Sequence, residues 1–442
     1  MPSSSDKSSR LAPAADSAVN LNRRSLLRGV TATASLLAAS RVAFPYGAFA
    51  QGAGPETTKA QLGYIALTDS APLIVAREKG FFTKYGMKDV EVLKQASWGG
   101  TRDNLVLGGG SGGIDGAHIL TPMPYLIHTG KVVQNNQPVA MSILARLNTN
   151  GQAISVSKAL MPAGAKLDSS PLKAAFAAKG NNKVAMTFRG GTHDLWIRYW
   201  LAAGGIDPEK DVETIVVPPP QMVANMKVGT MDAFCVGEPW NDQLVHQGLG
   251  YSACTTGEIW KDHPEKSLAM RADWVAKNPR AAEAITAATI EAQIWADKME
   301  NKEEVAAILA RRAWFNVPAP DILPRSKGDI DYGDGRKVEA SPLRMKFFAD
   351  HASYPFPSHD LWFLTEDIRW GILPPDLNTK TLIAAVNRED IWRKGAKLAG
   401  VADSAMPVGT SRGKETFFDG RVFDPEQPAA YLSSLAIKKI AA

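Results

Sequence analysis

Apolar segments of strand length alternate with segments of helical periodicity from residue 61 onward. The first series predicts strands at 61–67, 90–93, 114–119 and 139–144 and helices at 71–79 and 101–107. The second predicts strands at 153–157, 184–188, 214–217 and 233–236 and helices at 172–178, 193–203, 221–228 and 240–247. Strands separated by helices form βαβ units in mostly parallel sheets. Two such series, joined near residues 148–151, therefore predict an α/β protein with two lobes.

The character of the chain changes after Cys254. Residues 280–312 are Ala-rich and amphipathic, which predicts one long helix. Residues 317–360 have the composition of loops, and further helices are expected at 365–370, 382–387 and 391–399. We predict no disulfide between Cys235 and Cys254, because a free cysteine commonly serves as a small buried apolar residue.

Residues 1–50 have the layout of an export signal rather than of a folded element. Arg23-Arg24 precedes Ser25, a short apolar run and a small-residue end at 48–50, which is typical of a twin-arginine signal. We therefore predict a soluble periplasmic protein that is exported in folded form. This segment holds six of the 50 Lys and Arg but two of the 45 Asp and Glu, so the rest is nearly neutral. A nucleic-acid partner thus has no electrostatic support.

The glycine-rich run at 108–113 fits both the dinucleotide-binding and the nucleophile-elbow patterns. Both patterns need a strand before the glycines and a helix after them. Here a helix is predicted before the run and a strand after it, so we interpret it as a flexible connection. The sequence also has no Walker A, H-E-x-x-H or C-x-x-C motif, which removes sequence support for the common ATPase, zincin and redox classes.

Three turns at the ends of predicted strands have the composition of a ligand site, at residues 97–101, 188–194 and 237–240. Their glycines let backbone N–H groups approach a ligand, and a following helix start adds partial positive charge that favours an anion. One such turn alone is ordinary capping chemistry. Three of them at the carboxyl ends of strands favour a binding site there.

Five segments then carry a specific resemblance: residues 62–73, 90–99, 113–124, 190–194 and 236–241. They resemble the substrate-binding proteins of nitrate and bicarbonate ABC importers, and the resemblance extends over residues 60–400. It implies a two-lobed periplasmic-binding-protein fold of type II-like architecture that closes on a ligand in the cleft between the lobes. It also implies docking to permease and ATPase subunits at the inner membrane, with no chemistry performed. Unlike some members of that family, this chain has no lipoprotein cysteine near the predicted cleavage point.

The nitrate site of that family uses a tryptophan, a glutamine, a histidine, a glycine backbone N–H and a lysine. The resemblance places these on Trp98, Gln152, His193, Gly237 and Lys266. Nitrate is a flat, weakly basic monoanion that needs one fixed positive charge and in-plane donors in place of its water. Lys266 would supply the charge, and Gln152 and His193 would donate hydrogen bonds. For two of these residues a purely structural role is also possible. Trp98 is a residue type that suits a hydrophobic core, and Lys266, in the polar run 261–266, is a type that suits a solvated surface.

The resulting hypothesis is a periplasmic receptor for nitrate, with nitrite as a second ligand, that serves an ABC importer. The expected layout is a signal peptide at 1–50, lobe 1 at 51–150 and 255–442 with a C-terminal helical extension, and lobe 2 at 151–254. Three alternatives stay open. They are a calcium-dependent bicarbonate receptor, suggested by Glu265 beside Lys266, a nitrate sensor with an RNA-binding partner, and an enzyme using His193-Asp194 as a base pair. We expect no cofactor, no metal ion and no nucleic acid.

Overall fold

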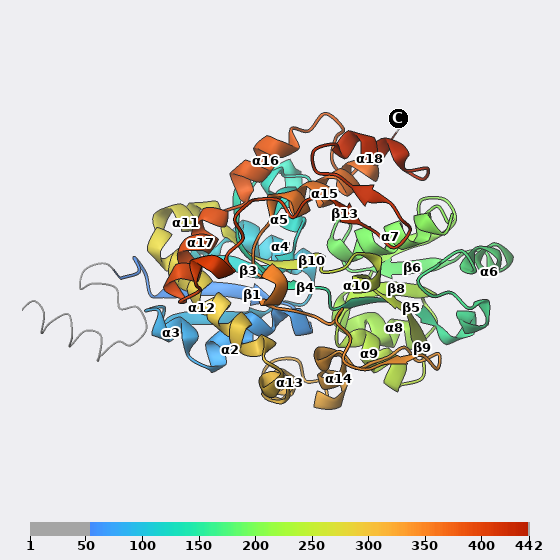
Figure 1. Cartoon of the computed structure of the whole chain (residues 1–442), viewed down its shortest axis with the longest axis horizontal. Coiled ribbons are helices and arrows are strands. Elements are labelled where there is room, and N and C mark those ends of the chain that lie inside the picture. Colours follow the sequence, from blue (N-terminus) through green and yellow to red (C-terminus); the bar gives the residue numbers. More distant parts are fainter. Residues whose placement is uncertain (1–53, 441–442) are drawn as a thin grey trace, which may run out of the picture. The chain divides into compact units, whose positions relative to one another are not determined.

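The computed structural model describes residues 54–440, which are built around two five-stranded sheets (Figure 1). The strand orders are β2-β1-β3-β10-β4 and β7-β6-β8-β5-β9. The α/β class with two lobes is therefore confirmed. The predicted export signal at 1–50 lies outside the described residues. Among the described residues, no helix is both long and apolar enough to span a membrane.

Lobe 1 is the name used here for the first sheet and the helices around it. Its strands are β1 (Lys59–Tyr64), β2 (Asp89–Lys94), β3 (Gly116–Leu120), β4 (Met141–Thr149) and β10 (Pro264–Arg271). Its helices are α2 (Ala71–Glu78), α3 (Phe81–Lys84), α4 (Trp98–Leu107), α5 (Met123–His128), α11 (Ala272–Lys277) and α12 (Pro279–Asp297). Every residue of β4 is buried, as is all of β10 except its last residue, so the sheet is covered on both faces there.

Lobe 2 is the second sheet with its helices. Its strands are β5 (Gln152–Ser157), β6 (Lys183–Met186), β7 (Glu213–Val216), β8 (Ala233–Gly237) and β9 (Gly250–Thr255). Its helices are α6 (Leu172–Lys179), α7 (Thr192–Ala203), α8 (Met222–Lys227) and α9 (Trp240–His246). The chain passes between the two five-stranded sheets twice, at the turn Asn150-Gly151 and through α10 (Thr256–Ile259).

The expectation of mostly parallel sheets holds only in part, because one strand in each sheet is reversed. β1 runs parallel to β2 and β3, whereas β10 runs antiparallel to both β3 and β4. Likewise β6 runs parallel to β7 and β8, whereas β5 is antiparallel to β8 and β9. The reversed strands are the first strand after each passage between the lobes. Parallel neighbours need a crossover connection within one sheet, whereas at these two points the chain enters from the other lobe.

Strands β9 and β10 were not predicted, and the helix expected at 280–312 is two helices. α12 begins at Pro279, a residue suited to a first helical turn. The Glu56 carboxylate accepts hydrogen bonds from the backbone N of Arg280 at 3.2 Å and of Ala281 at 3.0 Å. α12 ends at Asp297 and α13 (Lys302–Ala310) begins after a turn at 298–301. The prediction of one helix missed this break, although Met299 is the one apolar residue between Ala296 and Val305.

The C-terminal region contains a helix that contacts both lobes, α15 (Pro357–Arg369). Trp362 of α15 stacks on Trp196 of α7 in lobe 2, with the ring centroids 5.0 Å apart. On the lobe 1 side, the Asp360 carboxylate pairs with Arg146 of β4. Nearly every residue of α15 is buried, so this helix fills the space between the lobes rather than lying on one of them.

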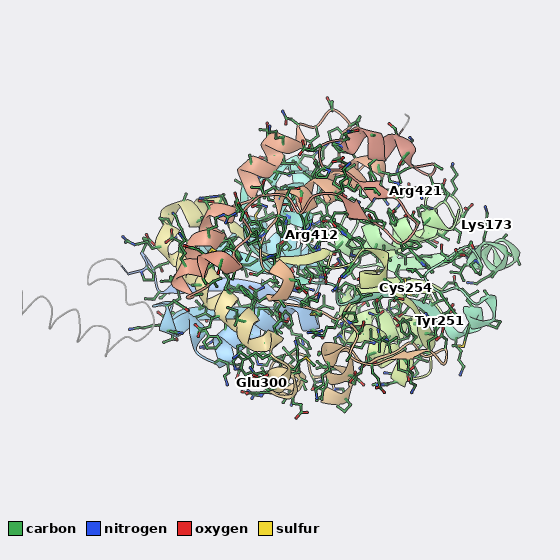
Figure 2. The ribbon with its side chains drawn as sticks, in the orientation of Figure 1. Lys173, Tyr251, Cys254, Glu300, Arg412 and Arg421 are labelled. Atoms are coloured by element: carbon green, nitrogen blue, oxygen red, sulfur yellow. The ribbon has the colours of Figure 1, made fainter. Side chains whose placement is uncertain are left out.

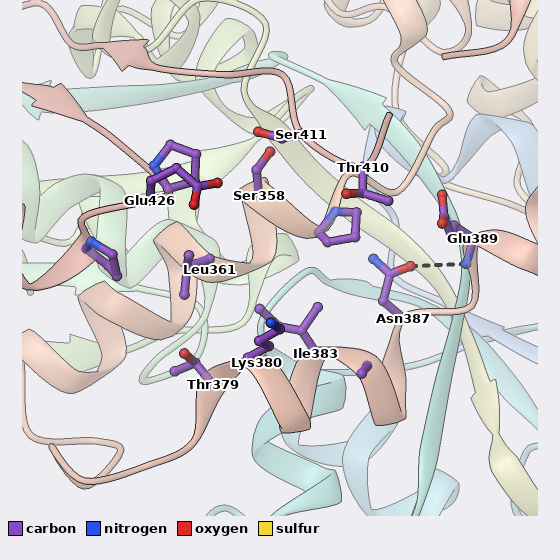
Figure 3. A pocket seen from close by; sticks show the side chains of 14 residues that line it. Ser358, Leu361, Thr379, Lys380, Ile383, Asn387, Glu389, Thr410, Ser411 and Glu426 are labelled. Atoms are coloured by element: carbon purple, nitrogen blue, oxygen red, sulfur yellow. Dashed lines mark hydrogen bonds between the residues drawn. The ribbon is translucent and has the colours of Figure 1, made fainter. Parts of the chain in front are cut away.

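The remaining elements come after lobe 2 in the sequence. They are α14 (Leu323–Lys327), β11 (Ile330–Asp331), β12 (Lys337–Val338), α16 (Thr379–Val386), α17 (Glu389–Leu398), β13 (Glu415–Thr416), β14 (Val422–Phe423) and α18 (Pro428–Ser434). Residues of α15, α16 and α18 line a groove of about 550 Å³ (Figure 3). In it the Glu389 backbone N donates to Asn387 Oδ1 at 3.1 Å. None of the five predicted ligand residues lines this groove.

The two cysteines are free and buried. Cys235 of β8 and Cys254 of β9 both pair with Ile154 of β5, from opposite sides (Figure 2 labels Cys254). Neighbouring strands lie roughly 4.8 Å apart, so the two Cα atoms are separated by about 10 Å. A disulfide needs Cα atoms within about 7 Å. The intervening strand therefore prevents the bond.

Candidate functional site

The five predicted ligand residues lie at the ends or in the middle of regular elements from both lobes. Trp98 opens α4, where the Ser97 side chain caps the helix by accepting from the Gly100 backbone N at 3.0 Å. This cap starts the helix at 98 instead of the predicted 101. Lys266 lies in β10, so both residues belong to lobe 1. From lobe 2, Gln152 opens β5, His193 is in the first turn of α7, and Gly237 ends β8 opposite Gln152.

The structure brings these residues together. His193 Nε2 lies 2.9 Å from Gln152 Oε1 and 3.4 Å from Lys266 Nζ. Lys266 Nζ lies 5.9 Å from the centre of the Trp98 ring. A Cβ atom on Gly237 would stand 2.5 Å from Gln152 Oε1, so any side chain there would collide with the cluster. The cluster thus joins the lobes, and the four side chains are at most 1 % exposed.

Lys266 is a buried ion-pair residue, which overturns its interpretation as a surface lysine. Its Nζ lies 2.9 Å from Asp69 Oδ2 and 2.8 Å from Glu265 Oε1, and it is 0 % exposed. Burial alone would lower the pKa of Lys266, but the two carboxylates raise it above its ordinary value. Burial raises the pKa of Glu265, even beside Lys266. Lys266 is therefore a cation whose charge is already balanced by the protein.

Asp69 is the member of the cluster that sequence analysis missed. It lies after β1 and accepts hydrogen bonds from Gln152 Nε2 at 3.0 Å and from His118 Nε2 at 2.6 Å, besides its pair with Lys266. Burial would raise the pKa of Asp69, yet Lys266 and His118 hold it well below its usual range. The segment around Asp69 lies within the resembling residues, but its carboxylate meets Lys266 only in the folded chain.

His193 is neutral and oriented by its neighbours. Burial, reinforced by the nearby Lys266, lowers the pKa of His193 well below its ordinary value. The Thr187 hydroxyl lies 2.5 Å from Nδ1, which leaves Nε2–H to donate toward Gln152. Asp194 faces elsewhere: it accepts from the Gly190 backbone N at 2.9 Å and from Arg198 Nε at 2.6 Å. The His193-Asp194 base pair of the enzyme alternative is therefore not formed.

Two buried donors in the cluster region have no hydrogen-bond partner among residues 54–440. They are the indole N of Trp98 and the hydroxyl of Thr68, next to Asp69. A buried donor without a partner is costly, so both groups are available to donate to a bound ligand or water. Neutral donors of this kind suit a small anion.

A groove of about 490 Å³ opens beside the cluster. Ser97 and Gly99, which flank Trp98, line it from lobe 1, and Thr187, the partner of His193, lines it from lobe 2. Its charged lining residues are Arg102 and Arg189, one from each lobe. The lining of this groove therefore carries positive charge from both lobes.

The carboxylate that kept the calcium alternative open is already occupied. Glu265 accepts from Lys266, from the Thr192 hydroxyl and from Trp196 Nε1 at 2.6 Å. Within the described part of the chain, no group of three or more His, Cys, Asp or Glu residues is placed to hold a metal ion.

The chain is similar to known proteins over most of its length. The model of the NMT1-like family matches residues 53–310. The chain is 62 % identical over 389 residues to the nitrate/nitrite binding protein NrtA of Nostoc sp. strain PCC 7120, covering 87 % of each chain. It is 44 % identical over 397 residues to the bicarbonate-binding protein CmpA of Synechococcus elongatus, covering 87 % of this chain and 88 % of that one. The crystal structure of the periplasmic nitrate-binding protein NrtA from Synechocystis PCC 6803 superimposes with a TM-score of 0.86 at 60 % identity, covering 87 % of this chain and all of the other.

Proposed function

The chain belongs to the NMT1-like family, and from that premise we propose that it captures nitrate between its lobes and delivers it to an ABC importer. One observation carries the proposal. In a chain 62 % identical to a nitrate/nitrite binding protein, one buried cluster between the lobes contains all five predicted residues: Trp98, Gln152, His193, Gly237 and Lys266. The proposed partners are the permease and ATPase subunits of the importer, and the proposed role is binding without chemistry.

The chemistry of the cluster supports a weakly basic monoanion. Lys266 Nζ, the Trp98 indole N–H and the Thr68 hydroxyl are buried donors of different kinds in this region. Nitrate spreads one charge over three oxygens and needs several donors of moderate strength. Nitrite has the same charge with two acceptor oxygens, so it is the proposed second ligand.

Calorimetry of the purified mature protein tests this proposal. We expect saturable binding of nitrate, weaker or equal binding of nitrite, and no change when EDTA or calcium is added. Bicarbonate binding that requires calcium, without nitrate binding, would instead assign the function of the 44 % identical bicarbonate-binding relative. Absence of binding to all three anions would reject both proposals.

We also propose that the chain reaches the periplasm through the twin-arginine route. Replacing Arg23 and Arg24 together by Lys keeps the charge but removes the guanidinium pair, so we expect the precursor to stay in the cytoplasm. Immunoblots of periplasmic and cytoplasmic fractions measure this. A matched control replaces Arg10 and Arg41 by Lys and should export normally. Normal recovery of the Arg23/Arg24 variant from the periplasm would contradict the proposal.

A further inference from the structure

We propose that Asp69 restricts the site to singly charged anions. The inference rests on the proposed function of the site and concerns a residue outside the five implied by the family resemblance. Asp69 acts here as a specificity-determining carboxylate that repels a second negative charge.

Asp69 borders the other members of the cluster. Its Oδ2 lies 2.9 Å from Lys266 Nζ and accepts from Gln152 Nε2 at 3.0 Å. A Cβ atom on Gly237 would stand 3.3 Å from the same oxygen. On the other side, Oδ1 accepts from His118 Nε2 at 2.6 Å, and the His118 ring lies 5.3 Å from that of Trp98. An anion held by these groups must therefore lie close to the Asp69 carboxylate.

His118 fixes Asp69 in this position. The Ile65 backbone N donates to His118 Nδ1 at 3.4 Å, so the ring proton is on Nε2 and points to Asp69. Burial lowers the pKa of His118 below its ordinary value, so this histidine contributes a dipole but no positive charge. Asp69 is 0 % exposed, which removes water as a screen for its charge.

The charges of the cluster leave no surplus cation. Lys266 is matched by Asp69, and Glu265 stands on its other side at 2.8 Å. His193 and His118 are neutral. A monoanion adds one unmatched charge, which the unpartnered indole of Trp98 and hydroxyl of Thr68 can stabilise. A dianion doubles that charge beside a fixed carboxylate, and like charges in a dry site repel each other strongly.

The test compares Asp69→Asn with Asp69→Glu in the full mature chain. The probes are nitrate and sulfite, at a mildly alkaline pH where sulfite is a dianion, with chlorate as a monoanion of sulfite-like shape. Calorimetry, or competition against nitrate, gives the affinity ratio. We expect the parent and Asp69→Glu to prefer nitrate and chlorate to sulfite, and Asp69→Asn to lose at least about tenfold of that preference. If Asp69 only supported the fold, its replacement would lower the affinity for all three anions by similar factors.

An unchanged ratio in a folded Asp69→Asn variant would overturn the inference. Asp69→Ser is a second neutral variant if the first does not fold, and failure of both to fold would show that the carboxylate serves folding instead. A parent that binds no nitrate would reject the proposed function. A parent that binds nitrate, with unaltered discrimination in the neutral variants, would reject this inference alone.

Discussion

Lys266 shows how strongly one residue depends on partners that are distant in the sequence. It lies in a polar run, yet its side chain is completely buried in a central strand. Ion pairing with Asp69 and Glu265 makes this burial tolerable. Removing one partner of a buried pair leaves uncompensated charge, which is far worse than losing the contact itself.

Lys266→Met should therefore abolish nitrate binding and also destabilise the fold. We expect a loss of about 3–5 kcal/mol in the free energy of unfolding, because Asp69 and Glu265 would face each other without a cation. Denaturant unfolding and calorimetry measure the two effects. Lys261→Met, at an exposed position in the same run, is the control and should change neither. Wild-type stability in the Lys266 variant would contradict the ion-pair account.

Much of the site could be predicted residue by residue, but its charge balance could not. Trp98, His193 and Gly237 lie in turns whose composition is visible locally in the sequence, whereas Gln152 and Lys266 were assigned only through the family resemblance. Asp69 and Glu265 are also visible in the sequence. Nothing local reveals that they share Lys266, since Asp69 is brought to β10 only through the pairing of β1, β3 and β10.

At the scale of elements, the turn between β4 and β5 is a tightly constrained connection. Gly151 has φ of +85°, and a Cβ atom there would stand 2.9 Å from Met345 Cβ. Asn150 precedes it, also with positive φ, and donates from Nδ2 to Asp262 Oδ1 at 3.0 Å. The two passages between the lobes are thus tied to each other. The polar residues of this connection allowed its position to be predicted, whereas strand β10 beside it was missed.

Gly151→Ala should lower stability by more than the cost of positive φ alone. The added methyl group meets Met345, and overpacking in a filled site adds about 1–3 kcal/mol to the backbone strain. Gly164→Ala is the matched control, because Gly164 has φ of +76° with open space around it. Thermal unfolding of both variants gives the comparison. Equal losses would mean that Met345 moves aside freely.

On the scale of the whole molecule, buried neutral histidines make stability depend on pH. Burial lowers the pKa of His263 from 6.5 to about 3 and that of His359 to about 4. The unfolded chain takes up protons near pH 6.5, whereas the folded chain does not, so their contribution is complete above pH 6.5. It is lost as the pH falls through the window toward 3.

We expect the midpoint of thermal unfolding to fall steadily below pH 6.5. Each buried histidine adds a slope of about 1.4 kcal/mol per pH unit in its window. His263→Asn should flatten the profile, although it also removes the contact to Thr256 Oγ1 at 2.8 Å. His351→Asn, at an exposed position, should leave the slope unchanged. A parallel profile in His263→Asn would assign the acid sensitivity to other groups.

The position of β10 has a consequence for the order in which the chain can fold as it is synthesised. The five strands of lobe 2 are contiguous in sequence, so their sheet can form while the ribosome is still making the C-terminal half of the chain. The sheet of lobe 1 forms later, because β10, which lies between β3 and β4, is synthesised only after all strands of lobe 2. Trp196 of α7 is covered later still, because its stacking partner Trp362 lies in α15. Docking of the last helices is then the event that completes both halves of the molecule.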